Sequence, residues 1–151
     1  MSTSVQLKIL NPLIHQWGLP KYQTPMSAAF DLIACIVEPI SIYPGEVAKI
    51  PTGMAIYLGN PNLAGLILPR SGLGLKGLIL ANTTGLIDAD YQGEIIILAW
   101  NRSHENIVIT PGMRIAQYVA VPIVRCEFEV VEEFHEITER GSLGFGSTGH
   151  I

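Results

Sequence analysis

Turn-forming residues interrupt this chain about every 8–12 residues, and this spacing constrains its fold more than any other feature. The 151 residues include 15 glycines and 10 prolines. Short apolar and β-branched runs lie between the turns, such as 47–50, 54–58 and 63–68. No window of about ten residues shows a helical period, and at most one helical turn is expected, after Ser71. The pattern therefore predicts an all-β sandwich or barrel.

Further strands are expected where similar runs occur along the chain. Residues 5–9 alternate apolar and polar side chains, which is typical of a half-buried strand. Residues 78–81 and 95–100 are expected to form two strands joined by a hairpin or tight loop. The remaining expected strands cover residues 30–37, 114–121 and 128–131.

The composition favours one compact domain. Hydrophobic residues make up 48% of the chain and charged residues 15%, which argues against disorder. A net charge of −4 argues against nucleic-acid or anionic-membrane partners, which need basic patches. The start lacks the apolar core of a signal peptide, and no apolar run approaches the ~20 residues of a spanning helix. A soluble, cytoplasmic protein is expected, with Cys35 and Cys126 as free thiols.

The stretch from Asn82 to Ile95 contains several side chains that are candidates for catalysis or ligand binding. Asp88, Asp90 and Tyr91 stand between apolar runs, close to Gly85 and Gly93. A carboxylate beside buried strands is costly unless it is paired, bound or solvated, so either aspartate is a candidate for chemistry. The alternative is that both are turn residues, because Asp readily hydrogen-bonds its own backbone.

Scarce cations and glycines mark other candidate sites. Arg70, Lys76, Arg114 and Arg140 lie in or beside glycine-rich or motif-like stretches, which suits a small polyanion. Residues 140–149 contain four glycines, and they form either a frayed tail or an arm that closes over a ligand. The two GxGxxG matches, at 72–77 and 144–149, are not dinucleotide fingerprints, because no helix is expected after either.

Five stretches in order resemble the motifs of the trimeric dUTP pyrophosphatase (dUTPase) family. They are Ala28-Ala-Phe-Asp31-Leu32, Pro69-Arg-Ser-Gly-Leu-Gly74, residues 82–95, Arg114-Ile-Ala-Gln117, and Arg140-Gly followed by Gly144-Phe-Gly-Ser-Thr-Gly149. The resemblance covers nearly the whole chain. It implies a jelly-roll β domain over residues 1–139 and a flexible arm over 140–151 that closes over the active site.

The resemblance also implies an activity. Family members hydrolyse dUTP to dUMP and pyrophosphate with Mg²⁺, which keeps uracil out of DNA and supplies dUMP for thymidylate synthesis. They are homotrimers whose active sites are shared between subunits. Asp88 matches the general base that activates water for attack on the α-phosphorus. Tyr91 matches the ring that packs under the deoxyribose and excludes a 2′-hydroxyl.

The other site residues are assigned by the same resemblance. Uracil would be bound by Asn82 and by the backbone around Gly85, Leu86 and Ile87. The phosphates would be bound by Arg70, Ser71, Gly72, Gln117, Arg140, Gly146, Ser147 and Thr148, while Phe145 would stack on uracil. Asp31 matches the acid that contacts the metal through water.

Residue by residue, plainer interpretations remain open. Arg70 would equally suit a structural salt bridge, and Gln117 would equally suit an inward polar residue bonded to backbone. Two other functions also remain open for the chain as a whole. One is a dCTP deaminase of the same superfamily, although the stretch 88–91 favours the pyrophosphatase. The other is a jelly-roll binding or capsid-like module without catalysis, against which the presence of Asp88, Arg70 and Tyr91 argues.

Overall fold

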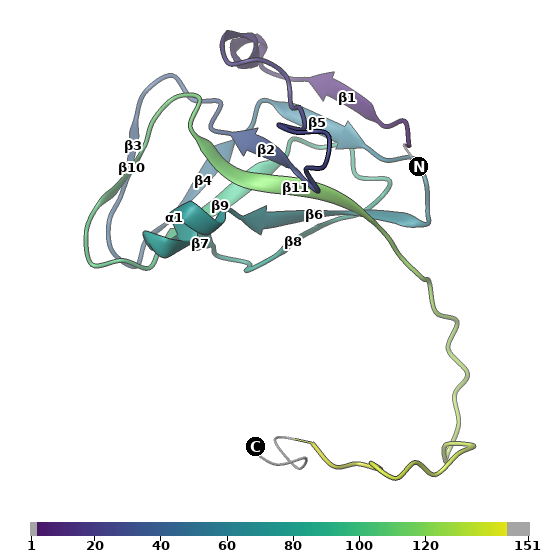
Figure 1. The fold of residues 1–151 in the computed structure, drawn as a ribbon. Helices are drawn as coiled ribbons and strands as arrows, with labels where there is room; N and C mark the ends of the chain where they lie inside the picture. Colours follow the sequence, from purple (N-terminus) through teal and green to yellow (C-terminus); the bar gives the residue numbers. More distant parts are fainter. Residues whose placement is uncertain (1–2, 145–151) are drawn as a thin grey trace.

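The computed structural model describes residues 3–144 and confirms the all-β class that the turn spacing predicts and the jelly roll that the resemblance implies (Figure 1). The strands are, in chain order, β1 (Gln6–Ile9), β2 (Phe30–Ile33), β3 (Ile40–Ile42), β4 (Val47–Pro51), β5 (Met54–Tyr57), β6 (Leu63–Pro69), β7 (Leu78–Leu80), β8 (Gly85–Ile87), β9 (Ile96–Asn101), β10 (Ile107–Ile109) and β11 (Arg114–Pro122). A 3-10 helix, η1 (Pro12–Gln16), and a short α-helix, α1 (Ser71–Leu75), complete the fold.

The strands pair in two larger sheets and two short ribbons. One sheet has the order β2-β11-β6-β8, and the other has the order β4-β9-β7. The ribbons are β1 with β5 and β3 with β10. All these pairs are antiparallel. Because strands that are neighbours in a sheet are often distant in sequence, the sheets tie the two halves of the chain together.

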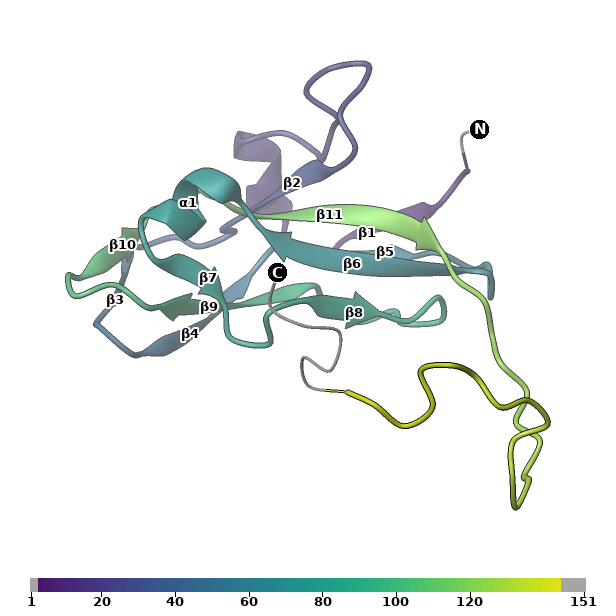
Figure 2. The ribbon, with the colours of Figure 1, turned by 60° about the horizontal axis from the view of Figure 1, so that its bottom comes forward.

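The core lies between the two larger sheets. In Figure 1 the β2-β11-β6 face lies in front of β4 and β9, and Figure 2 shows the same two layers from another direction. Apolar side chains from both sheets and from the β1–β5 ribbon fill the space between them, including Leu32, Ile50, Met54, Ile97 and Tyr118. This burial supplies the main driving force for folding.

Tyr118 is the largest side chain in this core, and its hydroxyl is buried without a hydrogen-bond partner among residues 3–144. Its ring stacks on Phe30, with centroids 5.2 Å apart. The phenol lies directly over Gly65 of β6, where a Cβ would overlap it. Burial raises the pKa of Tyr118 to about 12, and the nearby Tyr22 adds to the shift. The side chain is therefore held as an uncharged phenol.

The two helices differ in how well the sequence predicts them. α1 is the single helical turn expected after Ser71. η1 was not expected, although its start carries a known signal. The side chain of Asn11 accepts a hydrogen bond from the backbone N–H of Leu13, and Pro12 opens the helix.

Other boundaries differ from the sequence prediction. The strand expected over 30–37 ends at Ile33. β7 and β9 pair as expected, with Leu80 opposite Ala99, but a hairpin does not join them. The connecting chain instead crosses to the other sheet, where β8 pairs with β6. The three-residue strands β3, β8 and β10 were not predicted.

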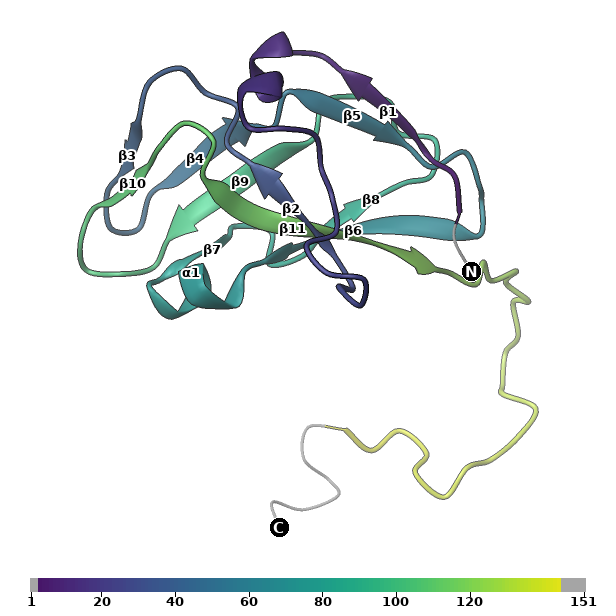
Figure 3. The same ribbon diagram turned by 45° about the horizontal axis from the view of Figure 1, so that its top comes forward.

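The chain leaves the jelly roll at the end of β11, and the described part beyond it, residues 123–144, contains neither helix nor strand (Figure 3). The strand expected over 128–131 is therefore wrong. Phe128 is 94% exposed and Val130 is 98% exposed, so this alternating segment has no partner within the described chain. We call residues 123–144 the C-terminal segment.

The cysteines are free, as expected, with Cys35 buried and Cys126 exposed. Burial raises the pKa of the Cys35 thiol, and the charge of Glu94 adds to this effect. Among residues 3–144, no helix is long and apolar enough to cross a membrane.

Candidate functional site

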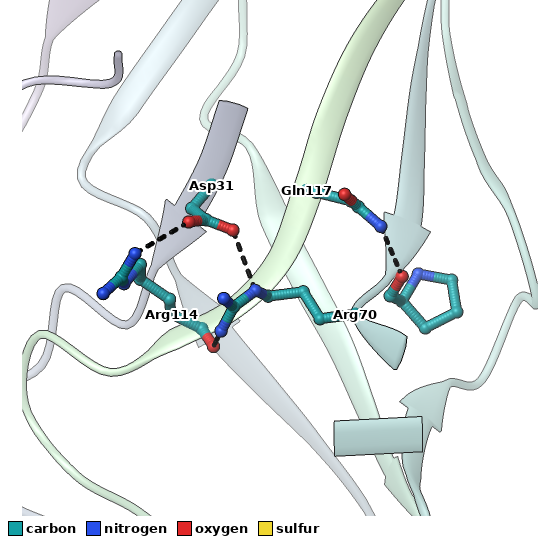
Figure 4. A network of polar contacts seen from close by, with 5 residues as sticks. Asp31, Arg70, Arg114 and Gln117 are labelled. Carbon is teal, nitrogen blue, oxygen red and sulfur yellow. Dashed lines mark hydrogen bonds and ion pairs between the residues drawn. The ribbon is translucent and has the colours of Figure 1, made fainter. Parts of the chain in front are cut away.

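A cluster of charged side chains joins three strand ends of one sheet (Figure 4). Asp31 on β2 accepts from two arginines: Arg70 Nε at 2.8 Å and Arg114 Nη1 at 3.2 Å. Arg70 Nη1 also donates to the backbone carbonyl of Arg114 at 2.9 Å. The Asp31 side chain is only 13% exposed, whereas those of Arg70 and Arg114 are 34% and 51% exposed. The cluster has one negative and two positive charges, so it presents a net positive charge to solvent.

Gln117 and α1 border this cluster. Gln117 lies opposite Asp31 in the β11–β2 register, and its side-chain amide donates to the carbonyl of Pro69 at 2.9 Å. Ser71 and Gly72 follow Arg70 at the start of α1, and both are exposed. A Cβ at Gly72 would meet nothing within 4 Å in the described chain, so a ligand has room to approach this backbone. The structure thus brings Asp31, Arg70, Ser71, Gly72 and Gln117 together.

The predicted base-binding residues form an exposed loop and the edge strand β8. Asn82 is exposed, and Thr83 has φ +57°, in the left-handed region that marks a tight turn. Gly85 is buried against β6, where a Cβ would lie 3.0 Å from the Cβ of Ile67. The exposed Leu86 and the half-buried Ile87 follow it. β8 forms the edge of its sheet and pairs only with β6 in the described chain, so its outer backbone groups are available to a ligand.

Asp88 and Tyr91 lie in the loop that follows β8. The carboxylate of Asp88 is exposed and makes no hydrogen bond or ion pair with the residues that the structure describes. Tyr91 is 42% exposed, and its hydroxyl donates to the carbonyl of Glu94 at 3.1 Å. Its ring lies over Gly93, where a Cβ would overlap it. The loop therefore presents a free carboxylate and a fixed ring.

A hollow of about 500 Å³ adjoins this loop. It is lined by Asp88, Ala89 and Asp90, by the end of β5, the start of β6 and the connection between them, and by Ile123 and Arg125. The hollow contains none of the residues around Asp31. Two separate polar regions are thus present on one chain.

These two regions lie at opposite ends of β6. The register places Gly65 opposite Ile87, so Asp88 lies beside Ala64, whereas Arg70 follows the far end of the strand. Six residues of β-strand span about 20 Å. Figure 2 shows the same arrangement, with α1 at one end of β6 and the end of β8 near the other. One chain therefore does not bring Asp88 to Arg70.

The predicted tail residues are only partly described. Arg140 lies in the exposed C-terminal segment, and its Nε donates to the carbonyl of Leu143 at 3.1 Å. Gly141 has φ +51°, a conformation that favours glycine. Phe145, Gly146, Ser147 and Thr148 lie outside the described residues.

The residues of the Asp31 cluster fit a metal ion that is held mainly by phosphates and waters and not by protein side chains. Within the described range, no group of three or more His, Cys, Asp or Glu side chains could hold an ion. Each oxygen of Asp31 accepts one arginine N–H and retains acceptor capacity for a water molecule. Mg²⁺ is often held by phosphates and waters with few carboxylates, so a contact through water suits this geometry.

Comparison with known proteins places the chain in a family. The family model described as dUTPase matches residues 15–149. The chain belongs to the dUTPase family. The dUTPase match begins before Asp31 and extends past Arg140, so it covers all five motif-like stretches.

Curated dUTPase relatives match along nearly their full length. The chain is 55% identical over 150 residues to the deoxyuridine 5'-triphosphate nucleotidohydrolase of Psychrobacter sp. (strain PRwf-1), covering 97% of both chains. It is also 55% identical over 147 residues to the protein of the same name from Acinetobacter baumannii (strain ACICU), covering 96% of this chain and 97% of that one.

Solved dUTPase structures share the fold. The Staphylococcus bacteriophage 80alpha dUTPase with dUPNHPP superposes with a TM-score of 0.82 at 29% identity, covering 99% of this chain and 100% of that one. A mutant dUTPase from phage phi11 of S. aureus, described with a structural Mg(II) ion, has a TM-score of 0.78 at 25% identity, covering 89% of this chain and 100% of that one.

Sequence reasoning did not predict the contacts of two residues that the structure places at these regions. Arg114 was singled out as a cation that suits a polyanion, but its pairing with Asp31 was not expected. Glu94 accepts from the backbone N–H of Gly53 at 2.8 Å, which anchors the loop that carries Asp88 and Tyr91. Both residues lie in motif-like stretches, Arg114 in 114–117 and Glu94 in 82–95, but the sequence does not show which group either side chain contacts.

Proposed function

We propose that this enzyme hydrolyses dUTP to dUMP and pyrophosphate, with Asp88 as the general base. The observation that carries the proposal is the free, exposed carboxylate of Asp88 beside Tyr91 at the end of β8. An ionised carboxylate that lacks a protein partner can accept a proton from water, provided the substrate lies within hydrogen-bond reach. The names of the curated relatives and the bound nucleotide analogue in the phage 80alpha enzyme support dUTP as the substrate.

Base and sugar selection would come from the loop and edge strand before Asp88. The backbone of Gly85, Leu86 and Ile87, with Asn82, would pair with the uracil edge. The Tyr91 ring, fixed by its hydrogen bond to Glu94, would pack under the deoxyribose and exclude a 2′-hydroxyl. UTP would then be rejected by exclusion at the sugar.

The phosphates would bind at the Asp31 cluster. Arg70 supplies a planar fork of donors, and Ser71, Gly72 and Gln117 add a hydroxyl, an accessible backbone and an amide. Mg²⁺ bound to the phosphates would neutralise part of their charge, and Asp31 would contact its waters. Arg70 also pairs with Asp31, and Gln117 donates to the backbone carbonyl of Pro69, so the plainer interpretations of both residues hold as well.

The separation of the two regions supports an active site shared between copies of the chain. A general base must come within about 3 Å of its water, and that water attacks a phosphorus that Arg70 helps to hold. The two residues lie about 20 Å apart on one chain, by strand length. We therefore propose that Asp88 of one copy meets Arg70 of another in a homotrimer.

The C-terminal segment offers a second argument for assembly. Five of its large apolar side chains are almost fully exposed, among them Val124 at 90%, Phe134 at 88% and Ile137 at 101%. Residues 123–151 also carry six glutamates and two arginines, which account for the whole net charge of −4. Exposed apolar side chains in this number mark a contact surface. We propose that the segment docks on another copy and that residues 140–151 close over its active site.

One assay tests the function. The protein is supplied separately with dUTP, UTP, dTTP and dCTP in the presence of Mg²⁺, and pyrophosphate and ammonia are measured. Pyrophosphate from dUTP alone is the expected result. Ammonia from dCTP would identify a deaminase, and neither product would indicate a binding protein. Chelation of Mg²⁺ with EDTA is expected to abolish the release of pyrophosphate, and added Mg²⁺ to restore it.

A further inference from the structure

An irregularity in β11 brings Arg114 to the Asp31 cluster. In a regular strand, residues three apart such as 114 and 117 point to opposite faces of the sheet. Here the register shifts by one residue, because Arg114 pairs with Ile33 while Ala116 pairs with Leu32. The extra residue, Ile115, forms a β-bulge. Arg114 and Gln117 therefore share the face of Asp31, as Figure 4 shows. Bulges that redirect a side chain often lie next to active sites.

Arg114 contacts both other members of the cluster. Its guanidinium holds one oxygen of Asp31, and its backbone carbonyl accepts from Arg70 Nη1. Arg70 thus has one N–H directed to Asp31 and one to the carbonyl of Arg114. A guanidinium has five N–H groups, so three remain for another ligand. If Asp31 paired with Arg70 alone, the negative charge of Asp31 would cancel the positive charge of Arg70. Arg114 adds a second positive charge that offsets the charge of Asp31.

We propose that Arg114 is a positioning residue for the substrate phosphates. It acts through Asp31, which it holds in place so that the remaining donors of Arg70 point toward the triphosphate. The proposal rests on the proposed function, because it assumes that Arg70 binds phosphate. The bulge at Ile115 turns the Arg114 side chain to the face of the sheet that binds phosphate.

Kinetics of Arg114→Gln test the proposal. The loss of one partly exposed, charge-assisted contact is expected to raise the KM for dUTP roughly threefold to tenfold. We expect kcat to change by less than about twofold, because Arg114 does not touch the reacting atoms in this account. Arg114→Lys keeps the charge and should recover most of the affinity. Arg102→Gln removes an exposed arginine outside the cluster and is the matched control, with KM unchanged.

Two inhibitors separate positioning from a general loss of structure. Inorganic pyrophosphate reports on the phosphate region, and deoxyuridine reports on the base and sugar region. Arg114→Gln should weaken inhibition by pyrophosphate by the same factor as the KM, and leave inhibition by deoxyuridine unchanged. Equal weakening of both inhibitors, or of neither, would overturn the proposal.

A double-mutant cycle tests whether Arg114 acts through Asp31. In an Asp31→Asn background, Arg114→Gln should change inhibition by pyrophosphate by less than about twofold, because the carboxylate that it holds is gone. Full additivity of the two changes would refute the proposed route. A wild-type protein that releases no pyrophosphate from dUTP would instead refute the proposed function, so the two failures are distinguishable.

Discussion

Removal of the Tyr118 hydroxyl is expected to stabilise the protein. The oxygen is buried in the core, and no group of the described chain forms a hydrogen bond with it. An unpaired buried polar group costs about 1–3 kcal/mol. Tyr118→Phe keeps the ring that stacks on Phe30 and removes only this oxygen. We therefore expect its free energy of unfolding to exceed that of the wild type by about 1–2 kcal/mol at neutral pH.

The same substitution has a predicted pH dependence. The pKa of Tyr118 is raised to about 12 in the folded protein, whereas an unfolded tyrosine ionises near pH 10. Between these values the unfolded chain loses a proton that the folded chain keeps, so the stability of the wild type falls as the pH rises. Tyr118→Phe lacks this titration. Its advantage should therefore grow by up to about 2.7 kcal/mol between pH 10 and 12.

Urea unfolding followed by tryptophan fluorescence measures both effects. Both proteins are compared at one protein concentration, because assembly makes the midpoint concentration-dependent. With a slope of about 2 kcal/mol/M, the midpoint at neutral pH should shift up by roughly 0.5–1 M at unchanged slope. Tyr43→Phe, at an exposed position, is the control and should shift little. A Tyr118→Phe protein less stable than the wild type would show that the hydroxyl has a partner, and would refute the reasoning.

Three further predictions concern the active site. Asp88→Asn should lower kcat by about 10²–10⁴ while binding of a non-hydrolysable dUTP analogue persists, and near-normal turnover would make Asp90 the next candidate base. Tyr91→Ala should raise the use of UTP relative to dUTP, and an unchanged ratio of kcat/KM values would mean that the sugar is sensed elsewhere. Deletion of residues 140–151 should leave a folded trimer with little activity, as judged by light scattering and a pyrophosphate assay. A monomeric or unfolded product would show that these residues do more than cover the site.

The local signals in the sequence account for most of the jelly roll. The apolar runs at 54–58, 63–68 and 95–100 became β5, β6 and β9, because strands of this type need only a buried face and turns at both ends. The single turn α1 followed from the absence of any longer helical period. The sheet order could not be predicted in this way, since the pairing of β8 with β6 depends on residues distant in sequence.

The failed strand at 128–131 has a physical reason. Phe128 and Val130 alternate with glutamates, which is the pattern of a half-buried strand. A strand also needs a neighbour for its backbone groups, and none in the described chain pairs with this segment. We propose that the partner lies on another copy, which a pattern within one chain cannot reveal.

The candidate site was predictable residue by residue but not in its geometry. The resemblance named Asp31, Arg70 and Gln117, and the structure brings these side chains together. The position of Arg114 depends on the bulge at Ile115. The bulge changes the face of the sheet to which Arg114 points, and it leaves no clear mark in the sequence. The distance between Asp88 and Arg70 likewise follows from the register of β6 and β8.

Mixing two inactive variants tests the shared active site most directly. Asp88→Asn and Arg70→Gln are each expected to be inactive alone, and the two chains are co-refolded in equal amounts. If each site takes Asp88 from one copy and Arg70 from another, half of the sites receive an intact Asp88 and half of those an intact Arg70, so about a quarter of the sites are complete. The account predicts that about a quarter of the wild-type dUTPase activity returns on mixing. If both residues served the same site from one chain, no mixed trimer would contain a complete site, and the absence of any regained activity would contradict the account.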